Sequence, residues 1–408
     1  MWRKERRYTG DRQSDDSLIS LSTSLRDLAM NSLRFSKQPF TEEELKDATP
    51  KQILQRMLST SSYISTTSSL ATKYNSASTN PSTFAFEELG KGQCGTVYAL
   101  IGSPTIVKIP NHEGKFEELG IDYRRHTRVQ EAIQQHGQNL DHARLPKLHA
   151  FLSPKSDFWK KYGLLFPHHV DVRNFGLTSE RIFSAPLPVR EALVDVLLPP
   201  LNKNQKHKFL MKPENKHCII RMYLGRRCTI KTQKLHTIKL QNFPLHVNEM
   251  EDLHLNTGYF ARCMANTLAI IHWGAKIDGN DIEFVLGSSP AQTKRPSSDE
   301  LEKLSLWEMA EACELDFSQR TMEMWVIDFN QCSQVEDDEA GIDKMIKAFI
   351  HNDPYYPRPG QADENDQELW KIFRTSYLFE SAKLTKSKGP FKFIIGVEET
   401  GKSIDSLF

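Results

Sequence analysis

The chain has 408 residues, enough for one two-lobed domain with a tail or for two or three smaller domains. Its 53 Lys and Arg are balanced by 52 Asp and Glu, so a nucleic-acid partner, which needs a basic surface, is not indicated. No apolar run approaches the roughly 18 residues of a membrane helix, and no apolar segment of a secretory signal follows the basic N-terminus. Six scattered cysteines without a C-x-x-C pair indicate reduced thiols, so we expect an intracellular protein, cytoplasmic or nuclear.

Residues 1–83 are predicted to form a disordered arm rich in Ser and Thr. Between Ser59 and Thr83, 15 of 25 residues are Ser or Thr, and such a segment buries too little apolar surface to offset the entropy of ordering. Thr41 to Glu44 is a capping-box pattern ahead of apolar residues at 45, 53, 54, 57 and 58. One transient helix in a flexible tail is therefore expected, with a partner-binding helix as the alternative.

Residues 84–187 predict a β-rich unit. Apolar and β-branched runs broken by Gly and Pro indicate short strands, and apolar residues at helical spacing indicate one long helix. The expected elements are strands at 96–101 and 106–109, a helix over 116–133, and strands at 145–152 and 177–183.

Residues 188–385 predict a mainly helical unit, with insertions near 200–216 and 287–320 and a tail at 386–408. Strands that come first and helices that come afterwards favour an α+β fold with segregated lobes. The expected elements are helices at 189–198, 260–271, 342–350 and 369–377, one helix within the second insertion, and strands at 218–224, 284–286 and 324–327.

A glycine-rich segment places Gly90, Gly92 and Gly95 ahead of Val97 in a G-x-G-x-x-G-x-V pattern. Glycines let a backbone fold closely over phosphate groups, so that amide N–H groups can face the charge. Because a strand follows the glycines, the pattern favours a kinase-type phosphate loop over a dinucleotide-binding turn, after which a helix would follow. A plain hairpin turn is the alternative for this motif taken alone.

Lys108 lies in the apolar strand 106–109. An unpaired lysine is costly to bury there, and one hairpin beyond a glycine loop it is placed to bind the α- and β-phosphates of a nucleotide. The alternative is a side chain that extends from a sheet edge into solvent. Three acids of the next helix, Glu117, Glu118 and Asp122, are candidate partners, and the choice among them stays open.

Acidic residues in the second half carry the remaining candidate roles. Asp278 follows a hydrophobic helix, and a carboxylate on such a loop can accept the proton of a substrate hydroxyl. Glu283 and Asp328 adjoin buried strands and are candidate ligands of Mg²⁺, which prefers carboxylate and phosphate oxygens. The alternatives are an Asx-rich turn at 278–281 and a capping role for Asp328.

The order of these segments resembles that of protein kinases and of aminoglycoside- and choline-type phosphotransferases. The resemblance implies a two-lobed, kinase-like α+β fold that binds ATP and Mg²⁺. Lys108 and the glycine loop would hold the phosphates, Asp328 and Glu283 the metal, and Asp278 would be the catalytic base. The expected function is a Mg-ATP-dependent phosphotransferase acting on an unknown small molecule or protein.

Three positions depart from the kinase pattern. The His-Arg pair before the catalytic Asp is replaced by Lys276 and Ile277, the catalytic-loop Asn by Glu283, and the Gly after Asp-Phe by Asn330. An Ala-Pro-Glu segment is also missing after Asp328. A pseudokinase, meaning a nucleotide- or protein-binding module without turnover, is therefore the alternative function.

A second resemblance rests on six segments, at 92–98, 242–246, 271–273, 278–287, 327–332 and 352–359. Through them, residues from about 84 to 385 resemble a fungal family of unknown function whose members are often labelled zinc finger proteins. Nevertheless, no zinc site is expected, because the nearest set of ligands, Cys218, Cys228 and His217, lacks the close pairing usual in tetrahedral zinc sites.

Overall fold

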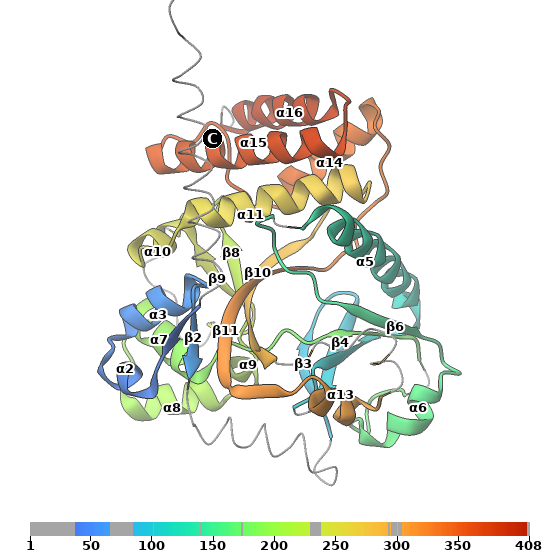
Figure 1. The fold of residues 1–408 in the computed structure, drawn as a ribbon, viewed down its shortest axis with the longest axis vertical. Coiled ribbons are helices and arrows are strands. Elements are labelled where there is room, and N and C mark those ends of the chain that lie inside the picture. Colours follow the sequence, from blue (N-terminus) through green and yellow to red (C-terminus); the bar gives the residue numbers. More distant parts are fainter. Residues whose placement is uncertain are drawn as a thin grey trace, which may run out of the picture.

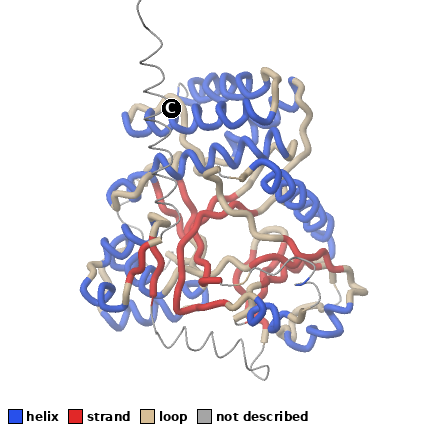
Figure 2. Tube along the Cα trace, viewed as in Figure 1, coloured by secondary structure: helices blue, strands red, loops and turns tan. Residues whose placement is uncertain are grey.

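The computed structural model describes residues 37–65, 85–228 except 101, 139 and 173, then 238–292, 294, 300 and 304–405. These residues form a mixed α+β protein with two β-sheets (Figures 1 and 2). Its first elements are β1 (Gln38–Phe40), α2 (Glu42–Asp47), α3 (Pro50–Leu58), β2 (Ser62–Ser65), β3 (Phe86–Lys91), β4 (Gly95–Leu100), β5 (Thr105–Pro110), η2 (Glu113–Lys115), α5 (Phe116–His136), β6 (Leu148–Leu152), α6 (Asp157–Tyr162), η3 (Gly163–Leu165) and β7 (Gly176–Glu180). They are followed by α7 (Leu187–Leu197), α8 (Lys203–Met211), α9 (Pro213–Lys216), β8 (Ile220–Tyr223), β9 (Phe243–His246), α10 (Val247–Asp252), α11 (Thr257–Ala269), η5 (Ile270–Gly274), β10 (Glu283–Gln292), α13 (Leu306–Ala312), β11 (Leu315–Ile327), α14 (Glu339–His351), α15 (Glu364–Leu384) and α16 (Gly389–Asp405).

The first sheet is antiparallel, in the order β3-β4-β5-β7-β6. Side chains of a strand alternate between the two faces, so β5 buries Val107 and Ile109 and leaves Ile106 and Lys108 half-buried on the opposite face. The chain reaches β6 through α5, which packs against β6 and β7. This alternation places Ile106 and Lys108 on the same face of the sheet.

The second sheet has the order β1-β2-β11-β10-β8-β9, with parallel pairs at its two edges. Its long central hairpin pairs β10 with β11, and Glu283 at the start of β10 lies opposite Ile327 at the end of β11. This register brings Glu283 close to Asp328, the next residue of the chain, although the two are distant in sequence.

Two connections join the sheets. Phe183, in the linker after β7, exchanges backbone hydrogen bonds of 3.0 and 2.7 Å with Ser288 of β10. Arg144, before β6, forms two backbone hydrogen bonds with β11. Its N–H donates to the Met324 carbonyl at 2.8 Å, and its carbonyl accepts from the Val326 N–H at 2.9 Å. Backbone pairing therefore fixes the first sheet against the second.

The C-terminal helices α11, α14, α15 and α16 pack on one another and form a layer above the second sheet (yellow to red in Figure 1). The predicted tail at 386–408 is wrong for α16, which buries Phe393, Ile394 and Val397 completely. These side chains lie on one face at helical spacing. The end of the described chain is therefore part of the core.

The prediction of a disordered arm is wrong for residues 37–65, whereas the rest of 1–83 lies outside the described residues. The predicted capping box at Thr41 begins α2, and a second one at Thr49 begins α3. α3 packs against α7, and β2 pairs with β11. The Ser/Thr-rich composition concealed these short elements, which are stabilised by burial against the second sheet.

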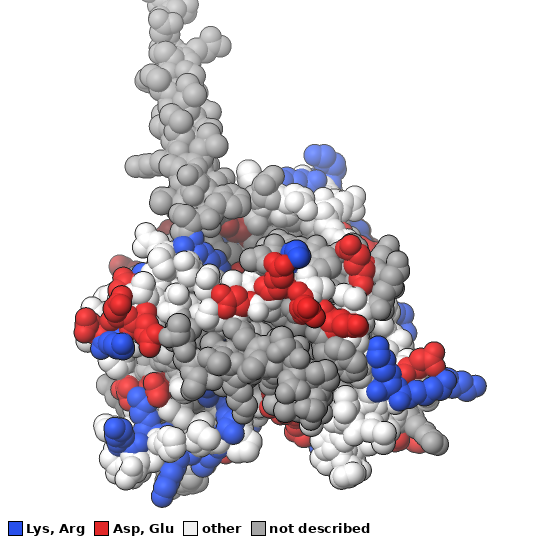
Figure 3. Space-filling view, turned by 60° about the horizontal axis from the view of Figure 1, so that its bottom comes forward, with Lys and Arg blue, Asp and Glu red and all other residues white. Residues whose placement is uncertain are grey.

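The remaining predicted elements are confirmed with shifted ends, as β4, β5, α5, β6, β7, α7, β8, α11, α14 and α15. Both insertions are more regular than expected: α8 and α9 lie within 200–216, and β10 and β11 extend into 287–320 on either side of the expected helix, α13. No helix among the described residues is long and apolar enough to cross a membrane. Basic and acidic side chains both occur on the face drawn in Figure 3, in line with the balanced charge.

Candidate functional site

A cavity of about 650 Å³ lies between the two sheets and is lined by residues of both. Its size is within the roughly 300–1,000 Å³ range of small-molecule sites. All but one of the predicted site residues line it: Gly90, Gly92, Gly95, Val97, Lys108, Glu283 and Asp328. The exception is Asp278.

The glycine segment forms the turn between β3 and β4. The Gly92 N–H donates to the Gly95 carbonyl at 2.9 Å, and a Cβ at Gly95 would lie 2.6 Å from the Ile109 carbonyl oxygen, so only glycine fits there. Asn111, just after β5, donates its amide N–H groups to the carbonyls of Gly92 and Gln93 at 2.8 and 3.0 Å. Sequence reasoning missed Asn111, because its only signal was one amide side chain in a turn.

Lys108 forms two ion pairs at the centre of the cavity. Its Nζ lies 2.7 Å from the Asp122 carboxylate and 3.4 Å from that of Asp328. Burial alone would lower the pKa of Lys108, but the two carboxylates outweigh it and raise the pKa above its ordinary value. The partner left open by the sequence is therefore Asp122, while Glu118 pairs with Lys115.

Asp122 lies on the buried face of α5, in the stripe of Leu119, His126 and Val129. Burial opposes its ionisation, but Lys108 outweighs burial and lowers the pKa of the carboxyl. Its second oxygen accepts a hydrogen bond of 3.1 Å from the Phe329 N–H. One carboxylate thus holds both Lys108 and the residue after Asp328.

Two further carboxylates, Asp281 and Glu283, line the cavity together with Asp328. Burial raises the pKa of Glu283 to about 7; its ion pair with Arg221 opposes the shift, and the charges of Asp328 and Asp281 add to it. Burial also raises the pKa of Asp328, although Lys108 opposes the shift. The Glu283 and Asp328 carboxylates are oxygen donors suited to a divalent cation, whose charge would relieve this repulsion.

The two aspartates of the loop before β10 differ in their surroundings. The Asp278 carboxylate is buried and accepts hydrogen bonds from the backbone N–H groups of Asn280 and Ser333, at 3.1 and 2.9 Å. Asp281 lines the cavity and accepts a hydrogen bond of 2.6 Å from the Gln331 amide. A turn at Gly279, where φ is +69°, separates the two residues, and the sequence holds no signal to choose between them.

A buried hydrogen-bond network holds this loop to α15. His272 of η5, a π-helical turn of the kind often found at functional sites, lies 3.2 Å from the Asp278 carbonyl through Nε2 and 2.8 Å from the Tyr377 hydroxyl through Nδ1. Trp273 Nε1 donates to the same hydroxyl at 2.8 Å. Burial lowers the pKa of His272 to about 3, so its ring is neutral and donates from Nε2 to the carbonyl.

Part of the cavity wall is apolar. A Gln241 amide hydrogen bond to the Leu89 carbonyl, 3.0 Å long, joins the segment before β9 to β3, and both residues line the cavity. An apolar slot beside charged groups suits a ligand with a flat ring and an anionic tail. Six half-buried side chains line it: Leu89, Val97, Ile106, Ile182, Ile219 and Ile327.

Comparison with protein-family models gives one match. A family of unknown function, whose model is described as "Zinc finger protein", matches residues 324–389, from the end of β11 to the start of α16. That stretch contains one cysteine, Cys332, and one histidine, His351, so it does not supply the four ligands of a zinc finger. A comparison with functionally curated proteins found no match to the chain.

Proposed function

We propose that the cavity binds Mg-ATP and that the protein is a kinase-like phosphotransferase whose acceptor is unknown. The observation that carries the proposal is the position of Lys108, whose ammonium group lies between Asp122 and Asp328 in a cavity that the glycine turn also lines. A lysine there is held charged and oriented, as binding to a phosphate requires. The apolar slot would take the base of the nucleotide.

Glu283 and Asp328 are the residues that would hold the metal, because both carboxylates line the cavity together with Lys108. A bound Mg²⁺ would neutralise the charge of the phosphates. With a pKa of about 7, Glu283 is ionised only in part near neutral pH. Metal binding would therefore displace its proton and grow stronger as the pH rises through this value.

Phosphoryl transfer also needs a carboxylate that accepts the proton of the acceptor hydroxyl. Asp281 lines the cavity, whereas the Asp278 carboxylate is occupied by two backbone N–H groups. We therefore assign the role of base to Asp281 and a positioning role to Asp278. This differs from the expectation drawn from kinase spacing, which placed the base at Asp278.

A nucleotide-binding module without turnover is the second candidate. It is favoured by the pairing of Glu283 with Arg221 and by Asn330, whose side-chain oxygen is buried beside the cavity without a hydrogen-bond partner. The ion pair makes the Glu283 carboxylate less available to a metal, and Asn330 stands where kinases have a glycine. The two candidates share the binding site and differ only in chemistry.

Thermal unfolding with and without Mg-ATP tests the binding step. Ligand at about a hundredfold its Kd should stabilise the protein by roughly 2.7 kcal/mol. Lys108→Met should abolish this gain, and Lys371→Met is the matched control, because Lys371 is exposed and pairs only locally on α15 with Glu368. An unchanged response of Lys108→Met would exclude the cavity as the nucleotide site.

Single-turnover ATP hydrolysis then separates the two candidates. Asp281→Asn should abolish turnover and leave the thermal shift of nucleotide binding largely intact, because the amide still fits the site. Asp278→Asn should lower turnover less. Turnover that survives in Asp281→Asn and disappears in Asp278→Asn would reverse the assignment, and binding without turnover in the wild type would favour the binding module.

A further inference from the structure

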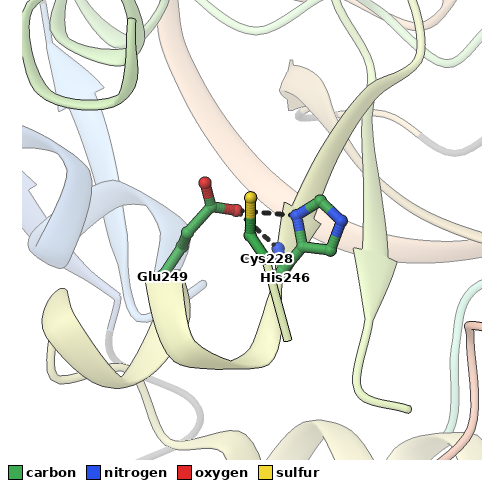
Figure 4. A group of neighbouring side chains, drawn as sticks. All are labelled: Cys228, His246 and Glu249. Carbon is green, nitrogen blue, oxygen red and sulfur yellow. Dashed lines mark hydrogen bonds and ion pairs between the residues drawn. The ribbon is translucent and has the colours of Figure 1, made fainter. Parts of the chain in front are cut away.

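We propose that Cys228, His246 and Glu249 form a zinc-binding site (Figure 4). One potential ligand atom from each side chain, a sulfur, an imidazole nitrogen and a carboxylate oxygen, lies within 4.8 Å of the other two. His246 Nδ1 and the Glu249 carboxylate are 3.0 Å apart. This site is separate from the cavity, since none of the three residues lines it.

The second sheet brings these residues together from two segments of the chain. β8 and β9 pair in parallel, with Tyr223 opposite His246, so the ends of both strands lie side by side. The chain beyond β8 then reaches Cys228, while β9 leads into α10 and places Glu249 in its first turn. Cys228 is remote in sequence from His246 and Glu249, so close-pair spacing of Cys and His could not reveal the set.

Asn248 fixes the backbone of Cys228 at this point. Its side-chain oxygen accepts from the Cys228 N–H at 2.7 Å, and its amide group donates to the Cys228 carbonyl at 3.3 Å. The His246 ring packs edge-on against Tyr223, with centroids 5.5 Å apart. Supporting contacts that orient each ligand are a regular feature of metal sites in proteins.

The donor set identifies the metal class. A thiolate and an imidazole favour zinc over magnesium or calcium, which prefer oxygen ligands alone. Ligand atoms around a tetrahedral zinc are about 3.5 Å apart, so side-chain movements of about 1 Å would close this cluster on an ion. All three residues are half-buried, which leaves a fourth position for water.

Helix capping is the competing explanation for part of the cluster. Glu249 accepts from the His246 N–H at 2.8 Å, as in a capping box. Capping accounts for the contacts between His246 and Glu249, including the part that the His246 side chain takes in the capping box, but it requires no thiol at position 228. The convergence of the Cys228 sulfur on the imidazole and the carboxylate is what points to a metal.

A zinc ion here would join the loop after β8 to the end of β9 and the start of α10. Arg227, next to Cys228, pairs with Glu251 of α10 and with Asp366 of α15, both at 2.8 Å. The bound metal would add a bond between the end of β8 and α10 at the same junction. We therefore assign the site a structural role. No zinc was expected from the spacing of Cys218, Cys228 and His217. The fold places Cys218 in the core and His217 at the cavity, and only Cys228 of that set belongs to the present cluster.

Cobalt titration followed by absorption spectroscopy tests the site in the full chain. Co²⁺ should give a thiolate charge-transfer band and the intense visible bands of tetrahedral coordination, with saturation at about one ion per chain, and Zn²⁺ should remove both. Cys228→Ser should abolish the charge-transfer band, whereas the matched control Cys313→Ser, which alters a buried cysteine packed near the first sheet, should retain it.

Glu249→Gln provides a second variant that keeps a side-chain acceptor for the capping hydrogen bond. It should bind Co²⁺ at least about tenfold more weakly while its circular dichroism stays that of the wild type. Absence of the charge-transfer band in folded wild-type protein would overturn the proposal, as would its persistence in Cys228→Ser. Neither outcome depends on nucleotide binding, so the two proposals stand or fall separately.

Discussion

Asp122→Asn removes one charge from the buried centre of the cavity and changes little else. The side chain is 4 % exposed, and its two oxygens contact Lys108 and the Phe329 N–H at 2.7 and 3.1 Å. The amide of Asn can retain an acceptor for Phe329 but cannot neutralise Lys108. The variant therefore isolates the electrostatic part of the contact.

Breaking a buried ion pair by removing one partner costs about 3–5 kcal/mol, because a buried charge is left uncompensated. Lys108 keeps Asp328 at 3.4 Å, so we expect a loss of roughly 2–3 kcal/mol in the free energy of unfolding. Replacing both partners by uncharged residues is often nearly neutral. The double variant Lys108→Met/Asp122→Asn should therefore recover most of this loss.

Urea denaturation of the single and double variants, followed by tryptophan fluorescence, measures both quantities. The pKa of Asp122 is lowered in the folded state, so its stabilising effect is present above the unfolded-state pKa of about 4 and is lost as the pH falls through the folded value. The difference between wild type and Asp122→Asn should shrink below about pH 4. A loss under about 0.5 kcal/mol, or costs that simply add in the double variant, would refute the reasoning.

Three further predictions concern the core around the site. Burial lowers the pKa of His126 to about 4. The free energy of unfolding should therefore fall as the pH drops from about 6.5 to 4, because the unfolded state binds a proton that the folded state does not. In potentiometric titration over that range, His126→Gln should take up about one proton less on unfolding than the wild type. Tyr377→Phe should cost about 2–4 kcal/mol in urea denaturation, because the buried His272 and Trp273 nitrogens lose the hydroxyl. Phe393→Ala in α16 should lower the free energy of unfolding by about 3–5 kcal/mol. Phe391 lies on the same helix and is 58 % exposed, so Phe391→Ala should lower it by under about 1 kcal/mol. Equal losses would contradict the packing of α16.

Local pattern was sufficient for much of the first sheet and for the residues that line the cavity. The glycine turn, the alternation around Lys108 and the helical spacing of α5 are each encoded within about twenty residues. The helical stripe even distinguishes Asp122 from Glu117 and Glu118, since Asp122 falls in line with Leu119 and His126. A stricter use of helical periodicity could have named the partner of Lys108 from the sequence alone.

Features that depend on contacts between distant segments could not be predicted in this way. The stability of residues 37–65 comes from pairing with β11 and packing on α7, both remote in sequence. The choice between Asp278 and Asp281 depends on where the turn at Gly279 directs the chain, and Ser333 completes that turn from another segment. Cys228 and His246 meet only because β8 and β9 pair in parallel.

The centre of the cavity is arranged at the expense of stability. Burial and mutual repulsion raise the pKa of Glu283, and burial raises that of Asp328, so both carboxylates are held in a state less favourable than in water. Lys108 and Arg221 offset part of this cost, and each is fixed by its own ion pair. A core selected for stability alone would replace such groups by apolar ones. Retaining them makes physical sense if a ligand supplies the missing charges, and the metal–nucleotide proposed above would do so, with its phosphates at Lys108 and its metal at the carboxylates.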